Sequence, residues 1–426
     1  MDLKELKALE LAARAPITFV NGYWIVPSQT SISASYRVSL APPSCECEDF
    51  QLRQQPCKHV IAARLVNERQ GGQEAPAMDT DAVPKKPTYK QDWPAYARAQ
   101  ASEKRRIQEL LRDLTSRLPE RARPAKRPGP RPHLVRDAIF AMALKVYCGL
   151  SSRRTHSDLE IAFEKGYTSK QIPGAKVTAF LEDPYFTPVL KDLIAFSAAP
   201  LRPLETKFTI DSSGFSSCRY EDYYNYKHGS GVPRRRCEWV KCHVASGVST
   251  HCVTAVRILD KDAADCPEFI PLMRATKRYG FTIEEVSADK AYLSYENFEE
   301  IAACGAQGYI AFKANSTGAV GGHFEKAFHL FVSDRANYMD HYHLRSNGES
   351  TFSAVKRKFG HAVMSLTDTA MMNECLVKFL CQNLSVLVQV QEKLGLVPVF
   401  WKDEPAADDE GGDKRNVIAF PEAQRI

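Results

Sequence analysis

The amino-acid sequence predicts an α/β protein whose mixed-sheet domain follows a small β-hairpin module and an all-helical module. Three observations predict this arrangement. Cysteine and histidine residues cluster at 45–59, and residues 134–195 show helical patterns separated by turn residues. From residue 206 onward, β-rich segments come first and then alternate with helical ones, an order typical of a mixed sheet with covering helices.

The N-terminal segment begins with a predicted β-hairpin. Residues 20–40 alternate in polarity and carry β-formers such as Trp24, Val26 and Val38. Such alternation is typical of half-buried strands. A short helical stretch at 60–65 follows the cysteine and histidine cluster.

Residues 68–93 are rich in Gly, Gln, Ala, Pro and Asp, which predicts a linker. Residues 95–118 predict a charged helix, because their leucines recur at helical spacing. The Pro/Arg stretch at 119–132 should be extended, because proline fixes its own backbone and favours open conformations.

Four further helices are predicted between residues 134 and 195. The first ends at Gly149, a typical helix terminator, and the others cover 153–164, 176–182 and 188–195. Their arrangement favours a DNA-binding module of helix-turn-helix character. An ordinary helical lid is the alternative reading.

The remaining segment predicts the mixed sheet. Strands are expected at 207–211, 239–245, 251–258, 282–288 and 309–313. Helices are expected at 266–279, 295–303, 342–359 and 369–394. We therefore expect five parts, with boundaries at 1–67, 68–130, 131–200, 201–398 and an acidic, disordered tail at 399–426.

Charge is distributed unevenly along the chain. The total is 57 Lys and Arg against 51 Asp and Glu, but residues 103–136 hold eleven basic and four acidic residues. A basic stretch and an acidic tail suit a polyanionic partner, although a solvated linker explains the same charges. No apolar run is long enough for a membrane span, and the N-terminus lacks a secretory pattern. Scattered cysteines indicate a reducing, cytoplasmic environment.

Cys45, Cys47, Cys57 and His59 form a C-x-C-x9-C-x-H pattern. Three thiolates and one imidazole make a closed tetrahedral set, which a structural zinc ion prefers. This spacing and its flanking residues resemble the SWIM zinc finger over roughly residues 20–67. Domains of that type are associated with binding DNA or protein.

A second group of possible ligands is Cys237, Cys242, His243, His251 and Cys252. Cys242 and His243 are neighbours in a predicted strand, so their side chains point to opposite faces. We expect core residues here and no metal site.

Two acids follow predicted strands. Asp211 ends the strand that includes Phe208, and Asp289 ends the strand at 282–288. Strand ends are where an α/β sheet presents its ligands, and carboxylate oxygens are the ligands that Mg²⁺ prefers. The two side chains are expected to share a divalent ion.

A third acid lies in a predicted helix. At about 100° per residue, Tyr342, Arg345, Glu349 and Lys356 fall within one stripe about 60° wide. The helix should therefore present one acid, two cations and a phenol to one surface, and a carboxylate among cations fits a site where a metal ion and a phosphodiester meet. A solvated face with intrahelical ion pairs is the alternative.

The spacing Tyr-x2-Arg-x3-Glu-x6-Lys matches the YREK signature of bacterial insertion-sequence transposases of the DDE class. The blocks around Asp211 and Asp289 resemble that family's first and second acid blocks, and the resemblance covers about residues 130–395. It implies an RNase H-like core in which Asp211, Asp289 and Glu349 bind two Mg²⁺ or Mn²⁺ ions. It also implies that Tyr342, Arg345 and Lys356 bind DNA.

The implied activity is metal-dependent cleavage at the ends of an element, followed by attack of the freed 3′-hydroxyl on target DNA. The expected partners are terminal inverted repeats and target DNA, bound by a homodimer in a bacterial nucleoid. A DNA-binding protein without catalysis and an RNase H-like nuclease that cuts without joining are the alternatives.

Overall fold

The computed structural model describes residues 3–28, 35–69, 92–121, 132–217, 239–259, 262–313 and 316–401. The chain divides into two compact units, 1–91 and 92–426. Residues 70–91 of the linker predicted at 68–93, residues 122–131 of the Pro/Arg stretch predicted at 119–132, Cys237 and the acidic residues beyond 401 lie outside the described residues.

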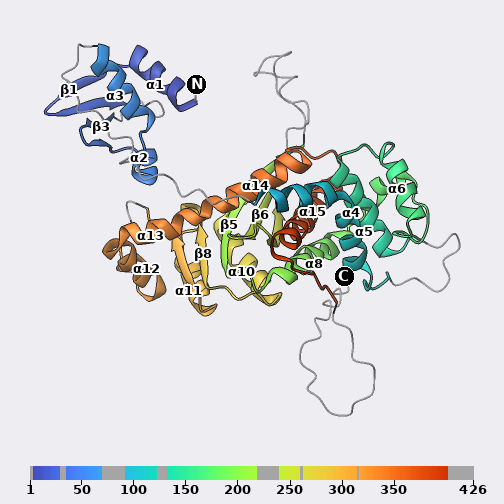
Figure 1. The fold of residues 1–426 in the computed structure, drawn as a ribbon. Helices are drawn as coiled ribbons and strands as arrows, with labels where there is room; N and C mark the ends of the chain where they lie inside the picture. Colours follow the sequence, from blue (N-terminus) through green and yellow to red (C-terminus); the bar gives the residue numbers. More distant parts are fainter. Residues whose placement is uncertain are drawn as a thin grey trace. The chain divides into compact units, whose positions relative to one another are not determined.

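The first unit is built on a four-stranded antiparallel sheet, in which the predicted hairpin is extended by a strand on each side (Figure 1). Its strands are β1 (Thr18–Val20), β2 (Tyr23–Pro27), β3 (Ser35–Leu40) and β4 (Pro43–Cys45). Its helices are α1 (Leu3–Arg14), α2 (Glu48–Arg53) and α3 (Lys58–Arg69). Alternate residues of β2 and β3, Trp24, Val26 and Val38, are buried with Val60 of α3 in one apolar cluster.

The second unit contains a five-stranded mixed sheet in the order β7-β6-β5-β8-β9. The strands are β5 (Lys207–Ser216), β6 (Trp239–Gly247), β7 (Val253–Leu259), β8 (Glu285–Ala288) and β9 (Gln307–Ile310). β6 pairs antiparallel with both β5 and β7, whereas β8 runs parallel to both β5 and β9. The predicted mixed α/β fold is confirmed, and this sheet is consistent with an RNase H-like core.

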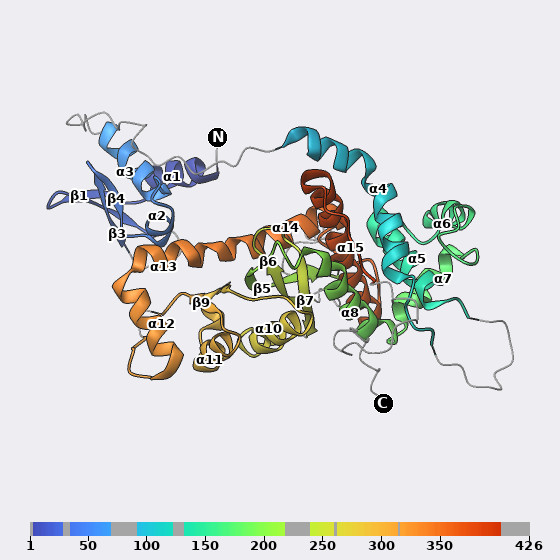
Figure 2. The same cartoon turned by 60° about the horizontal axis from the view of Figure 1, so that its bottom comes forward.

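Helices cover both faces of the sheet (Figure 2). α14 (Ser346–Phe359) lies on one face, and α10 (Phe269–Arg278) and α11 (Tyr295–Ala303) lie on the other. The prediction of one continuous α-helix over residues 342–359 is wrong. α13 (Arg335–Tyr342) ends at Tyr342, the 3₁₀ turn His343–Arg345 follows, and α14 begins afterwards. α12 (Gly322–Ser333) has no counterpart among the predicted helices.

The predicted helices before the sheet form as α4 (Trp93–Thr115), α5 (Val135–Cys148), α6 (Thr155–Glu164), α7 (Gly174–Glu182) and α8 (Phe186–Ala198). These helices contact one another, and most of them also contact a helix from the C-terminal part of the chain. The long helix α15 (Asp368–Leu394) contacts α4, α5, α7 and α8, and it also contacts the sheet.

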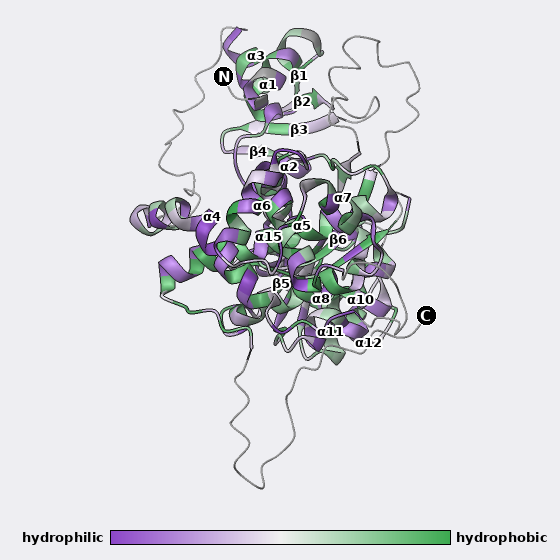
Figure 3. Cartoon of the chain, turned by 90° about the vertical axis from the view of Figure 1, so that its right-hand side faces the viewer, coloured by the Kyte–Doolittle hydropathy of each residue, from purple (hydrophilic) through white to green (hydrophobic). Residues whose placement is uncertain are grey.

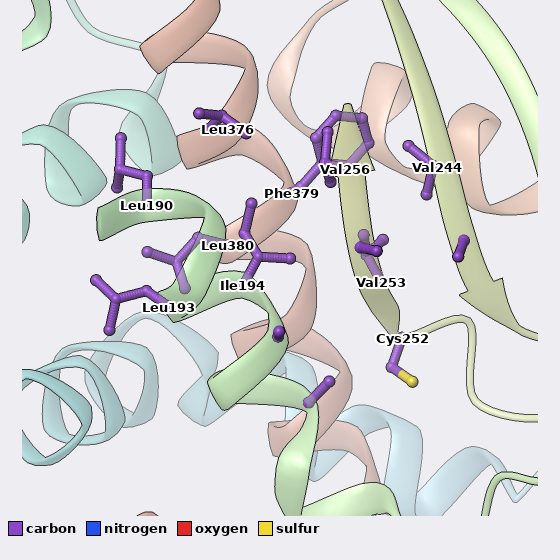
Figure 4. Close-up of a cluster of buried hydrophobic side chains, with 14 of the residues drawn as sticks. Leu190, Leu193, Ile194, Val244, Cys252, Val253, Val256, Leu376, Phe379 and Leu380 are labelled. Atoms are coloured by element: carbon purple, nitrogen blue, oxygen red, sulfur yellow. The ribbon is translucent and has the colours of Figure 1, made fainter. Parts of the chain in front are cut away.

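Figure 4 shows how this shared core joins helices to the sheet. Ile194 of α8, Leu380 of α15 and Val253 of β7 belong to one buried apolar cluster, in which Phe379 of α15 points towards β7. Figure 3 colours α8 as hydrophobic, in keeping with its burial. The helices expected as a separate module are therefore part of the same folded unit as the sheet.

The packed structure continues beyond the boundary expected at residue 399. Phe400 is buried and lies with Trp401 against Phe196, and Trp401 Nε1 donates to Asp113 O at 2.9 Å. No helix in the described residues is long and apolar enough to span a lipid bilayer.

Candidate functional site

Two sites emerge from the fold, one in each unit. The first brings together Cys45, Cys47, Cys57 and His59, all buried, with their ligand atoms within 4.8 Å of one another. His59 Nδ1 lies 3.9 Å from Cys45 Sγ and 3.8 Å from Cys57 Sγ. A tetrahedral zinc ion, with Zn–S of about 2.3 Å and Zn–N of about 2.0 Å, needs ligand atoms at separations of about this size.

Local structure explains why these four side chains meet. Cys45 ends β4, Cys47 caps the N-terminus of α2, and His59 lies in the first turn of α3. Backbone N–H groups stabilise negative charge on the sulfurs, because Cys47 N donates to Cys45 Sγ and Phe50 N donates to Cys47 Sγ. The hydrogen bond between Cys45 and Cys57 lowers the pKa of Cys57 and raises that of Cys45, and burial raises the pKa of Cys47.

The second site is a pocket of about 820 Å³ on the α14 face of the sheet. It brings together five of the predicted residues, Asp211, Asp289, Arg345, Glu349 and Lys356. The lining residues that were not predicted from the sequence include two with basic side chains, Arg357 and His361. Arg357 carried no distinguishing signal in a basic helix end, and His361 lies beyond that helix.

The sequence predicted that Asp211 ends its strand, and this prediction is wrong. β5 continues to Ser216 because β6 pairs with it along this whole length. The parallel pairing with β8, however, stops at Ile210 opposite Ala288. Asp211 and Asp289 are therefore the next residues on two adjacent parallel strands, which places their side chains at the same edge of the sheet.

Asp289 is held at this edge by short-range contacts. Its Oδ1 accepts from Lys290 N at 2.7 Å and caps the 3₁₀ turn Lys290–Tyr292. The hydroxyl of Tyr342 lies 3.4 Å from the same oxygen. Tyr342 itself is only 3% exposed, so its ring forms part of the pocket's support.

Glu349 reaches the pocket because Gly348 lets α14 approach β5 closely. A Cβ atom at Gly348 would lie 3.1 Å from both Asp211 Cβ and Thr209 Oγ1. The Glu349 side chain is 59% exposed and forms an ion pair with Arg345 at 2.8 Å. Among the described residues, only the cysteine and histidine cluster has three or more ligand atoms within 4.8 Å of one another. The three carboxylates share the pocket at wider spacing.

The pocket concentrates negative charge around Asp211. Burial raises the pKa of Asp211 to about 6, and the negative charges of Glu349 and Asp289 add to the rise. The N–H of Ser212 and the charge of Arg345 act in the opposite direction. Like-charged carboxylates that repel one another fit a site for a divalent cation, which would relieve that repulsion.

Two cations lie among these acids. Arg345 sits over the Tyr342 ring at 5.4 Å and pairs with Glu349. Lys356 Nζ donates to Ser213 Oγ at 2.7 Å and lies 5.5 Å from the centre of the Phe215 ring. Both cations are thereby directed along the pocket wall.

The second cysteine and histidine group does not form a metal site within the described residues. Cys242, His243 and Cys252 are completely buried in and beside the sheet, as expected for core residues. His251 instead hydrogen-bonds through Nδ1 to Thr351 Oγ1 at 3.2 Å.

Comparison with known proteins matches both sites to families. Residues 202–384 match the family model described as a transposase DDE domain, and residues 36–65 match the SWIM zinc finger. The first range contains the whole acidic pocket, and the second contains all four zinc-type ligands. No curated protein and no solved structure matches the chain.

Proposed function

Because the chain carries a transposase DDE domain and a SWIM zinc finger, we propose that it is an active DNA transposase using Asp211, Asp289 and Glu349. The proposed reaction is metal-dependent cleavage at the ends of an element, followed by strand transfer of the 3′-hydroxyl into target DNA. The observation that carries this proposal is the single pocket that the three acids line inside the DDE domain.

Asp211, Asp289 and Glu349 would hold the divalent ions, Mg²⁺ or Mn²⁺. Their fit rests on oxygen donors from two adjacent strand ends and one helix. It also rests on the pKa of Asp211, which burial raises first and the negative charges of Glu349 and Asp289 raise further. Such ions, when bound, activate water at neutral pH and stabilise the leaving oxygen of a phosphodiester. No protein nucleophile is needed.

The chain's own cations orient the DNA. Arg345 and Lys356 line the same pocket as the acids, so they can neutralise the phosphate on which the reaction takes place. Tyr342 has little exposed surface and supports Arg345 through its ring and Asp289 through its hydroxyl. A direct DNA contact by Tyr342, as the YREK resemblance implies, remains a prediction.

The proposed partners are terminal inverted repeats and target DNA, bound by a homodimer. The finger holds a structural zinc ion, since all four ligands are protein side chains and none of the four positions is left open for a substrate. Its proposed role is recognition of the element's ends, or of another protein in the DNA complex.

A transposase-derived protein that binds DNA without cutting it is the second candidate. The presence of acids at all three positions, in one pocket, favours the enzyme. A nuclease that cuts without joining would give only products shorter than its substrate, so product length on a gel distinguishes it from a transposase.

The test is excision and integration of a marker placed between the DNA ends that flank the gene. The parent protein is compared with Glu349→Gln and with Glu296→Gln, a matched control at an exposed position of α11. Movement by the parent and the control, but not by Glu349→Gln, supports the proposal. If all three proteins bind the ends and none moves the marker, the binding protein is the better description.

A further inference from the structure

A polar cluster lies directly behind the acidic pocket, on the opposite face of the sheet. Ser212 pairs across the strands with His243, and Gly214 pairs with Lys241. Because side chains alternate along a strand, Ser212, His243 and Lys241 face the α10 side, whereas Asp211 and Ser213 face α14. The proposed reaction makes no use of this cluster.

Asp265 is the centre of the cluster. Its Oδ1 accepts from Ser212 Oγ at 2.9 Å and lies 2.8 Å from Lys241 Nζ. Lys241 also donates to Ala263 O at 2.7 Å, which fixes the segment that carries Asp265. Burial alone would raise the pKa of Asp265, but the hydrogen bonds from Lys241 and Ser212 outweigh it and lower that pKa.

Ser212 connects this cluster to the pocket. While its hydroxyl donates to Asp265 on one face, its backbone N–H donates to Asp211 Oδ1 at 2.8 Å on the other. A continuous path of two hydrogen bonds therefore runs from Asp265, through Ser212, to the Asp211 carboxylate. A shift of Ser212 would rotate or release that carboxylate.

His243 supplies a second observation. It is completely buried, and in the described part of the chain neither of its ring nitrogens has a hydrogen-bond partner. Its Nδ1 comes within 3.5 Å of Asp265 Oδ1. Unsatisfied buried polar groups are rare in folded proteins and call for an explanation beyond stability, such as a role in a functional site.

Building on the proposed metal-dependent function, we propose that Asp265 is a positioning residue that holds Ser212 and thereby orients the Asp211 carboxylate towards a divalent cation. Groups that hydrogen-bond to metal ligands from outside orient those ligands, and their loss costs about 10- to 100-fold in metal affinity. The opposing view is that Asp265 only neutralises Lys241 and has no effect on the pocket.

The test measures Mn²⁺ binding to the full-length, zinc-loaded protein without DNA, from the electron paramagnetic resonance signal of free Mn²⁺. The variants are Asp265→Ala, Ser212→Ala and the double variant. Glu300→Gln is the matched control, because it breaks the exposed Arg274–Glu300 ion pair on the same α10 side of the sheet. Thermal melting verifies that each variant is folded.

We expect each single variant to weaken Mn²⁺ binding about tenfold, and the double variant to weaken it no further, since both changes break one path. Asp265→Asn keeps an acceptor oxygen and should bind Mn²⁺ more tightly than Asp265→Ala. Parental affinity in both single variants, or additive losses in the double variant, would overturn the proposed role of Asp265.

The variant Asp211→Asn distinguishes failure of the proposed role of Asp265 from failure of the proposed metal-dependent function. If Asp211→Asn weakens Mn²⁺ binding while Asp265→Ala and Ser212→Ala do not, only the role of Asp265 fails. If Asp211→Asn also binds Mn²⁺ like the parent, the proposed metal site itself is overturned, and the role of Asp265 falls with it.

Discussion

The zinc finger and the acidic pocket bring their metal-ligand side chains together in different ways. The finger takes its four ligands from residues 45–59, and all of them are buried around one point. The pocket takes its acids from positions 211, 289 and 349, and Glu349 stays largely exposed against Arg345. A closed set of side chains suits a structural ion, whereas a wider, open pocket leaves room for substrate and exchangeable ions.

The largest expected effect separates catalysis from zinc binding. Asp211→Asn and Asp289→Asn should each reduce cleavage of end DNA to background, because a neutral amide binds a divalent ion far less well than a carboxylate. Zinc content should remain at one ion per chain. Cleavage is measured on labelled DNA ends and zinc by elemental analysis; substantial cleavage by either variant would remove that residue from the catalytic set.

The reverse experiment alters the finger. Cys45→Ser and His59→Ala should each lose the zinc ion and unfold the N-terminal unit, because binding free energy of about 10–16 kcal/mol in such sites is also folding free energy. Limited proteolysis should then degrade residues 3–69 while the DDE domain persists. Cys304→Ser, at a cysteine outside both sites, is the control and should keep its zinc.

A stoichiometric zinc ion in Cys45→Ser would show that the ligand set is wrong. The same variant should bind Mn²⁺ in the acidic pocket with parental affinity, because no finger residue lines that pocket. Weaker Mn²⁺ binding would show instead that the two sites are coupled, and the contrast between them would no longer hold.

The difference between the sites also explains what could be predicted from the sequence. The four finger ligands are local, so their spacing alone indicated the cluster that the structure contains. Asp211 and Asp289 could be paired only by assuming that their strands are adjacent, which the parallel register of β5 and β8 now provides. The continuation of β5 past Asp211 depends on pairing with β6, which has no local signature.

Other features could not be predicted because they depend on contacts between residues far apart in the sequence or on local departures from ideal geometry. Asp265 accepts a hydrogen bond from Ser212 across 53 residues of sequence, and no sequence pattern around either residue indicates that contact. The stripe from Tyr342 to Lys356 assumed ideal helical geometry, but a 3₁₀ turn at His343–Arg345 interrupts it. Tyr342 consequently points into the protein towards Asp289, while Arg345 and Lys356 line the pocket.

A smaller effect is expected where α14 meets β5. Gly348→Ala would place a methyl group 3.1 Å from Asp211 Cβ. The overpacking should cost about 1–3 kcal/mol of stability, offset in part by about 1 kcal/mol of helix propensity that alanine gains over glycine. The displaced helix should also carry Glu349 away from the other two acids, so cleavage should fall. Ser350→Ala, at an exposed position of the same helix, should change neither melting temperature nor cleavage. Parental cleavage by a folded Gly348→Ala would mean that close approach of α14 is not needed for the reaction.

The smallest effect concerns DNA affinity. Lys356→Met removes a cation that the hydrogen bond to Ser213 directs along the pocket wall, and it should weaken DNA binding by a similar factor on all sequences. If Lys356 neutralises one phosphate, the slope of log affinity against log salt should decrease in magnitude by about 0.9. Lys393→Met, at an exposed position near the end of α15, should leave the slope unchanged. Fluorescence anisotropy at several salt concentrations measures both slopes, and an unchanged slope for Lys356→Met would assign this lysine to the support of β5 and not to DNA.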